Sequence, residues 1–176
     1  MRYKGLILSV IAIAALVVLI SGIKRQEKVR VSKAIEGLTA PEITVNDLSG
    51  KGLRLSDLRG SVVFINFWAS WCQPCREEMP SLQGLYNTFK DNGRFRMVTI
   101  LYRDDPDKAL SYLRENNLDL PLWIDSNGMA SSAYGLTGVP ETFVIDKKGI
   151  LRKKVIGPAD WSSQEALSLI SELIRE

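Results

Sequence analysis

The sequence contains no histidine among its 176 residues, and it has only two cysteines, Cys72 and Cys75. These absences limit the chemistry that the chain can perform. A structural zinc site normally takes four cysteine, histidine or carboxylate ligands, commonly as two cysteine pairs, and the sequence has no second pair. Covalent haem attachment needs a histidine directly after the second cysteine, where this chain has Arg76. We therefore expect no metal centre and no attached haem.

The sequence also lacks a strong excess of charge of either sign. Its formal net charge is +3, and many of the basic residues lie before residue 34. This balance does not indicate a nucleic-acid partner. The length is sufficient for one domain with a good core and too short for two domains of ordinary size.

The two cysteines form a Cys-Gln-Pro-Cys motif between an apolar run, Val62–Trp68, and a predicted helix. A purely structural disulfide is one interpretation, but so short a loop gains little stability through chain entropy. We favour a dithiol redox centre. The helix amino terminus stabilises a thiolate, which predicts that Cys72 attacks and that Cys75, one turn later, resolves the mixed disulfide. Pro74 fixes the backbone of this first turn.

Residues 6–23 are uniformly apolar, without charge or proline. As a helix they would span about 27 Å, close to the hydrocarbon thickness of a bilayer. Arg2 and Lys4 precede them, as in a signal sequence. The alternative is a cleaved signal peptide, but the small-x-small pattern Ala12-Ile13-Ala14 lies inside the apolar run rather than after it. We expect an uncleaved transmembrane signal anchor.

Basic residues flank the apolar run on both sides, so they do not fix its orientation. A dithiol redox domain is most useful where disulfides form and persist, which is outside the cytoplasm. We therefore expect a single-pass protein of the cell (inner) membrane whose redox domain faces the periplasmic or extracytoplasmic side. The expected parts are a basic amino terminus at 1–5, the anchor at 6–23, a charged linker at 24–38 and the folded domain at 39–176.

Apolar periodicity and turn residues predict alternating strands and helices. The expected strands are 43–45, 53–55, 62–67, 95–102, 120–124, 142–146 and 150–156, and the expected helices are 73–90, 107–116, 129–134 and 162–175. This order predicts a three-layer α/β sandwich with a mixed central sheet and an amino-terminal β-hairpin.

The segment Phe67–Cys75, with Pro80 downstream and Gly138-Val139-Pro140 before a strand, resembles the thioredoxin superfamily. The amino-terminal hairpin and the additional helix and strand at 106–124 resemble one branch of it. That branch is the membrane-anchored, extracytoplasmic thiol-disulfide oxidoreductases of the TlpA/ResA type, which include cytochrome c maturation reductases. The resemblance extends from about residue 38 to the carboxyl end and implies a thioredoxin-like fold.

The resemblance implies roles for several other residues. Val139 and Pro140 match a loop with a cis peptide bond whose backbone pairs with the substrate, although trans is the commoner state of X–Pro bonds. Trp71 matches a surface aromatic residue beside the cysteines, whereas Trp68 is expected to pack in the core. Pro80 is expected to kink the helix just after the site.

Glu78 lies three positions after Cys75, so both side chains fall on one face of the helix. In thioredoxins proper a buried aspartate accepts the proton of the second cysteine, but the matching residue here is Asn66, which cannot titrate. The TlpA/ResA resemblance implies that Glu78 takes this role. A partly buried carboxylate has a raised pKa and can exchange a proton with Cys75 near neutral pH. The alternative is a solvated carboxylate like Glu77.

We predict an enzyme, a protein-disulfide reductase, and the neutral Gln73 between the cysteines favours this reducing direction. It would pass electrons from a membrane dithiol donor to a disulfide-bearing substrate protein such as apocytochrome c, with no cofactor beyond the redox-active Cys72–Cys75 disulfide. One alternative is a copper-handling module, because two thiolates can bind Cu(I); the lack of histidine and the few methionines argue against it. Another is a thiol peroxidase, which needs a Pro-x-x-x-Thr-x-x-Cys setting that the residues before Cys72 do not match.

Overall fold

The protein is described by a computed structural model that covers Tyr3 and residues 34–176. The predicted anchor at 6–23 and most of the predicted linker lie outside these described residues. Within the described part of the chain, no helix is both long and apolar enough to cross a membrane. Residues 34–176 belong to one compact unit.

Seven strands form one mixed sheet in the order β2-β1-β5-β4-β3-β6-β7. In chain order they are β1 (Thr44–Asn46), β2 (Gly52–Arg54), β3 (Val62–Trp68), β4 (Phe95–Leu101), β5 (Leu122–Ile124), β6 (Glu141–Ile145) and β7 (Leu151–Ile156). β3 pairs in parallel with β4 and antiparallel with β6, so the strand that leads into the cysteines has a neighbour on each side.

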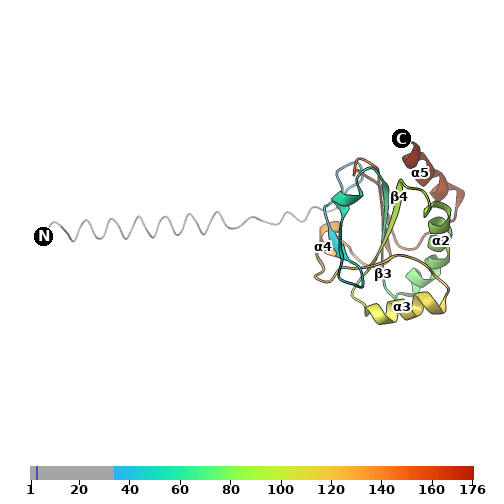
Figure 1. Ribbon diagram of the computed structural model, residues 1–176, viewed down its shortest axis with the longest axis horizontal. Helices are drawn as coiled ribbons and strands as arrows, with labels where there is room; N and C mark the ends of the chain where they lie inside the picture. The colour runs from blue at the N-terminus through green and yellow to red at the C-terminus, as the bar shows by residue number, and fades with distance from the viewer. Residues whose placement is uncertain (1–2, 4–33) are drawn as a thin grey trace. The chain divides into compact units, whose positions relative to one another are not determined.

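In the described part of the chain, four α-helices cover the two faces of the sheet (Figure 1). They are α2 (Gln73–Phe89), α3 (Pro106–Glu115), α4 (Met129–Tyr134) and α5 (Gln164–Arg175). Residues of α2, α3 and α5 pack in one core cluster, and α4 packs in a second cluster on the opposite face. The predicted three-layer α/β sandwich with a mixed sheet, an amino-terminal hairpin and an additional helix and strand is confirmed.

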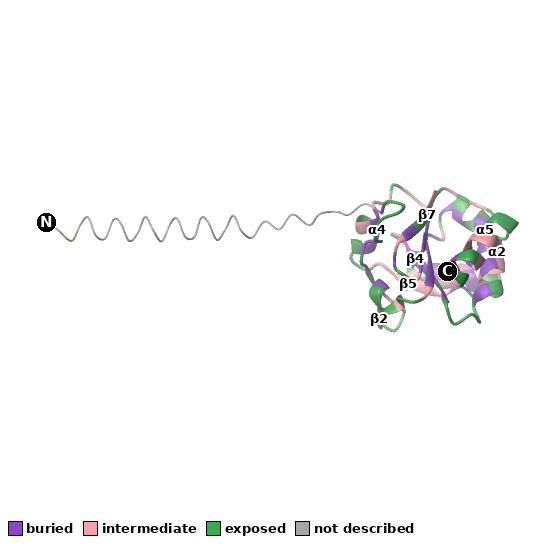
Figure 2. Ribbon diagram, turned by 90° about the horizontal axis from the view of Figure 1, so that it is seen from above, coloured by how far each residue is buried: buried purple, intermediate pink, exposed green. Residues whose placement is uncertain are grey.

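β3 is the central strand that positions the cysteines, and all seven of its residues are buried. Buried residues lie along the strands and on the sides of the helices that face them (Figure 2). Because side chains alternate along a strand, Val62, Phe64 and Trp68 pack toward α2, whereas the odd-numbered residues pack toward α4. Asn66 belongs to the α2 side and is fully buried, so its amide needs polar partners there.

The amino-terminal hairpin differs by one residue from the prediction in each strand. Leu55 was expected at the end of a strand, but it opens a short 3₁₀-helix, η1 (Leu55–Leu58). The cause is local: the Asp57 carboxylate accepts a hydrogen bond from the Arg54 backbone N–H at 3.3 Å and pairs with the Arg54 guanidinium at 2.9 Å, which turns the chain. The other predicted element ends fall within two residues of the observed ends.

α2 continues through Pro80 as one helix. Proline has no N–H to donate to the carbonyl oxygen of Arg76, one turn earlier. The hydroxyl of Tyr112 on α3 donates to that carbonyl instead, at 3.4 Å. Pro80 thus leaves the carbonyl oxygen of Arg76 free to accept the hydrogen bond from Tyr112, which joins α2 to α3 close to the cysteines.

Candidate active site

The two cysteines lie at the amino terminus of α2 and are joined by a disulfide, with an S–S distance of 2.06 Å. Cys72 is the N-cap residue, and Pro74 lies in the first turn. The backbone N–H of Cys75 donates to the Sγ atom of Cys72 at 3.2 Å. This donor and the helix dipole would stabilise negative charge on that sulfur after reduction. Cys72 keeps 4% of its surface exposed and Cys75 keeps none, so the first cysteine is the less buried of the two.

The Val139–Pro140 peptide bond is cis, as predicted. The carbonyl oxygen of Val139 lies 3.5 Å from the Sγ atom of Cys72. The structure therefore brings together the proline loop and the first cysteine, which are 67 positions apart in the sequence. Trp71, next to Cys72, is 59% exposed, and Trp68 is fully buried, as expected for a surface aromatic residue and a packing residue.

Glu78 is buried beneath the cysteines, with only 3% of its surface exposed. Its Oε1 atom accepts a hydrogen bond from Asn66 Nδ2 at 2.9 Å. Its Oε2 atom accepts from the Ala159 backbone N–H and from Trp161 Nε1, both at 3.2 Å. Burial raises the pKa of Glu78, and the three hydrogen bonds partly oppose that rise. The alternative of a solvated carboxylate is therefore wrong for Glu78, whereas Glu77 beside it is exposed.

A surface cleft of about 510 Å³ reaches Glu78. It lies between the first turns of α2 and the loop at 158–162, and Ser81 and Ala159 contribute to its walls. The hydroxyl of Ser81 accepts a hydrogen bond from the Trp161 backbone N–H at 3.1 Å, which fastens this loop to α2. Glu78 is therefore one of the residues that line an opening to solvent.

The AhpC/TSA family model matches residues 37–154 of the chain. The chain belongs to the AhpC/TSA family. The thiol-disulfide oxidoreductase ResA of Bacillus thuringiensis subsp. konkukian is 35% identical over 134 residues, which cover 76% of this chain and 73% of that protein. ResA of Bacillus subtilis is 33% identical over 122 residues, covering 69% and 68% of the two chains.

A solved structure supports the same assignment. The crystal structure of a putative thiol:disulfide interchange protein, DsbE, from Chlorobium tepidum has a TM-score of 0.71 and 27% identity, and covers 81% of this chain and 99% of that one. This AhpC/TSA family member is therefore a thioredoxin-like, ResA-type thiol-disulfide oxidoreductase. The disulfide on α2 is the group in the described structure that can perform this exchange.

Three residues of this AhpC/TSA family member contribute to the site but are not predicted from the sequence: Ala159, Trp161 and Glu141. Trp161 and Ala159 hold Glu78 from a loop more than 80 positions away in the sequence. A large apolar residue in the polar segment between the last strand and the last helix was the one available signal for Trp161. Asn66 was noted as a missing acid, but its amide serves as a hydrogen-bond donor to Glu78.

Glu141 is the third missed residue, and it is fully buried directly after the cis proline. Its Oε1 atom accepts hydrogen bonds from the backbone N–H and the hydroxyl of Thr137, at 2.7 and 2.8 Å. Its Oε2 atom lies 3.5 Å from Lys154 Nζ. The carboxylate therefore fixes the loop that carries Val139. Across residues 34–176, no cluster of three or more histidine, cysteine or acidic side chains is arranged to hold a metal ion.

Proposed function

We propose that this family member is a membrane-anchored, extracytoplasmic protein-disulfide reductase in which Glu78 handles the proton of the second cysteine. The supporting observation is the placement of Glu78, which is 3% exposed, lies one turn after Cys75 and lines a surface cleft. A group with a raised pKa in such a position is suited to accept and release protons near neutral pH.

The exchange begins when the thiolate of reduced Cys72 attacks one sulfur of the substrate disulfide. A mixed disulfide forms, and the other substrate sulfur leaves as a thiolate. Cys75 then attacks the Sγ atom of Cys72, and its thiol proton passes to the Glu78 carboxylate. The Cys72–Cys75 disulfide forms, and the second substrate sulfur leaves. Two electrons have moved to the substrate, whose sulfurs take up two protons.

The reducing direction is tested by the reduction potential, measured by equilibrating the full-length protein with glutathione buffers. A potential near that of thioredoxin, about −270 mV, supports a reductant. A potential near those of oxidising folding enzymes, about −120 to −180 mV, contradicts the proposed direction. No cofactor beyond the redox-active disulfide is proposed, so the purified protein alone should equilibrate.

The proposed location rests on the apolar segment at 6–23 and on the usefulness of dithiol exchange outside the cytoplasm. A membrane dithiol protein would then restore the reduced state. After mild reduction of intact cells, we expect a membrane-impermeant thiol reagent to label Cys72. Labelling that requires permeabilised cells would contradict the proposed orientation.

The proposed substrate is a protein disulfide such as that of apocytochrome c, as the TlpA/ResA resemblance implies. A Cys75→Ser variant tests it, because the mixed disulfide on Cys72 then has no resolving thiol. We expect this variant to trap an apocytochrome c whose haem-binding cysteines are oxidised. If general protein disulfides are trapped and apocytochrome c is not, the proposed substrate is wrong while the exchange activity stands.

A further inference from the structure

The loop between β3 and α2, which carries Trp71 and leads into Cys72, is fastened to the end of the neighbouring strand β4. The Oδ2 atom of Asp104 accepts a hydrogen bond from the Ser70 backbone N–H at 2.6 Å. A charged acceptor at this distance makes a strong hydrogen bond, and Asp104 is half-buried there. The other oxygen of the carboxylate accepts from the Asp105 backbone N–H at 2.8 Å. Both oxygens therefore hold backbone groups in place.

A second bond from the same turn holds the side chain of Trp71. The indole Nε1 of Trp71 donates to the carbonyl oxygen of Arg103 at 3.3 Å. Arg103 has a φ of +47°, in the left-handed region that non-glycine residues rarely adopt. The N–H of the indole is thus bonded to this turn, while 59% of the surface of Trp71 remains exposed beside Cys72.

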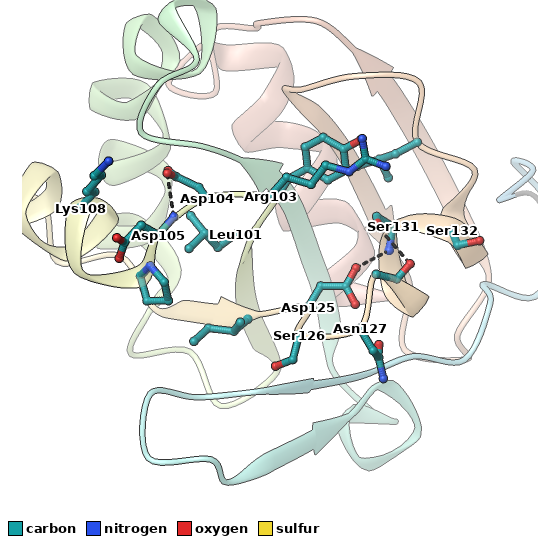
Figure 3. A pocket seen from close by; sticks show the side chains of 15 residues that line it. Leu101, Arg103, Asp104, Asp105, Lys108, Asp125, Ser126, Asn127, Ser131 and Ser132 are labelled. Carbon is teal, nitrogen blue, oxygen red and sulfur yellow. Dashed lines mark hydrogen bonds between the residues drawn. The ribbon is translucent and has the colours of Figure 1, made fainter.

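The turn that holds this loop also forms one wall of a groove of about 930 Å³ (Figure 3). Asp104 and Asp105 lie on that wall, and Asp125 lies across the groove on the segment between β5 and α4. The Asp125 carboxylate accepts from two backbone N–H groups of α4, at 3.0 and 2.8 Å. Asp104 therefore holds the loop between β3 and α2, and Asp125 holds the first turn of α4, each from the carboxyl end of a parallel strand.

We propose that Asp104 is a positioning residue, which fixes the Ser70–Trp71 loop so that the Trp71 indole and Cys72 are presented together to a partner protein. Its effect acts through the loop and does not require contact with the reacting sulfurs. The proposal uses the thiol-disulfide exchange activity alone, and it is independent of the role of Glu78, of the substrate and of the location of the domain.

The test compares Asp104→Ala with Asp104→Asn in the full-length protein. The alanine variant removes the acceptor for Ser70. The asparagine variant keeps one neutral acceptor, which can serve Ser70 at the expense of the Asp105 N–H. Asp105→Asn is the matched control, because it removes the same charge one position later and asparagine can still cap α3. Each protein is assayed with insulin, a protein disulfide, and with 5,5′-dithiobis(2-nitrobenzoic acid), a small disulfide that needs only the sulfur.

We expect Asp104→Ala to lower kcat/KM for insulin by roughly tenfold, since a misplaced docking surface impairs the approach of a large partner. The small disulfide should react within about twofold of the wild-type rate, because its attack does not use the docked loop. Asp104→Asn should restore most of the insulin activity, and Asp105→Asn should match the wild type.

An unchanged rate with insulin, an equal loss with both disulfides, or an asparagine variant as impaired as the alanine variant would each overturn the proposal. If Asp104→Ala does not fold, Trp71→Phe replaces it, because this change removes the indole N–H that bonds to Arg103 and keeps a smaller aromatic ring. The same selective loss with insulin is then expected, and equal rates for insulin in variant and wild type contradict the proposal. Insulin reduction by the wild type tests the exchange activity separately.

Discussion

Replacing Glu78 by glutamine is the most informative perturbation of the site. Glutamine cannot take a proton, but its side-chain oxygen can accept from Ala159 and Trp161 as Oε2 does. Its amide nitrogen would then face Asn66 Nδ2, which lies 2.9 Å from Oε1 in the wild type. If the Asn66 amide rotates, its Oδ1 atom can accept a hydrogen bond from this nitrogen. Oδ1 has no hydrogen-bond partner in the described structure. The fold should therefore survive at a cost of about 1 kcal/mol, the value of one hydrogen bond.

The pH dependence of stability gives the first readout. Burial raises the pKa of Glu78 above its ordinary value of 4.5, so the folded state keeps this proton to higher pH than the unfolded chain does. The unfolded state then binds fewer protons, and the free energy of unfolding falls as pH rises from about 4.5 toward the folded pKa. The slope from one such group is at most about 1.4 kcal/mol per pH unit. Glu78→Gln should remove this part of the decline.

The measurement is urea denaturation of the disulfide-bonded protein between about pH 4 and pH 8, where the cysteines do not titrate. Glu77→Gln is the matched control, because Glu77 is the adjacent residue on α2 but is exposed. Relative to wild type, Glu78→Gln should gain stability with rising pH, and Glu77→Gln should follow the wild-type curve. If both variants change alike, the carboxylate of Glu78 does not titrate as its burial requires.

The second readout is the reduced protein. Removing the carboxylate should change the titration of Cys75 and slow resolution of the mixed disulfide by about 10²-fold near neutral pH, the low end for general acid–base catalysis. Rates should recover at high pH, where Cys75 loses its proton to water. Unchanged thiol titration together with an unchanged rate would refute the role of Glu78.

Three further predictions concern the residues around the site. Trp161→Phe removes one donor to Glu78 and should raise its pKa further. A hydrogen bond to a charge is worth about 1.5–3 kcal/mol, so in denaturation series the decline in stability should begin at the same pH as in the wild type and end about one to two pH units higher. Lys154→Met leaves the buried Glu141 carboxylate without its cation and should lower the free energy of unfolding, measured in urea, by about 1–3 kcal/mol. Adding Glu141→Gln to this variant should restore most of that loss, because the buried charge is then removed. Met79→Ala opens a cavity in the fully buried core beneath the disulfide and should cost about 2–5 kcal/mol by thermal and urea denaturation, with little effect on the exchange rate at low temperature.

The features predicted well from the sequence are those set by local patterns. The apolar run of β3, the helical spacing after Cys75 and the strand alternation beyond Pro140 place the elements within two residues of their observed ends. The α/β order then restricts the topology, because parallel neighbours need helical connections. The 3₁₀-helix that begins at Leu55 could not be predicted from these patterns, because a side-chain contact between Arg54 and Asp57 ends the strand early.

The partners of the site could not be predicted, because they come from loops that are distant in sequence. Trp161 reaches Glu78 across 83 positions, and Lys154 reaches Glu141 between two strands. The sequence context of Asp104 shows only an acidic pair before a proline, which gives no sign of a role at the site. Its position beside Ser70 follows from the parallel pairing of β3 with β4, which aligns the carboxyl ends of both strands. Such contacts depend on tertiary register, which periodicity does not specify.

The arrangement separates the surface for the partner from the path for the proton. Cys72 lies near Val139 and beside the exposed Trp71, so we expect a partner protein to cover the cysteine from that surface. The described cleft that reaches Glu78 is lined by residues of α2 and the 158–162 loop, and neither Trp71, Cys72 nor Val139 contributes to it. We therefore expect a docked partner to exclude water from the reacting sulfurs and to leave the cleft beside Glu78 open to solvent. Resolution by Cys75 needs both conditions at once, because its proton must leave while the mixed disulfide is still covered.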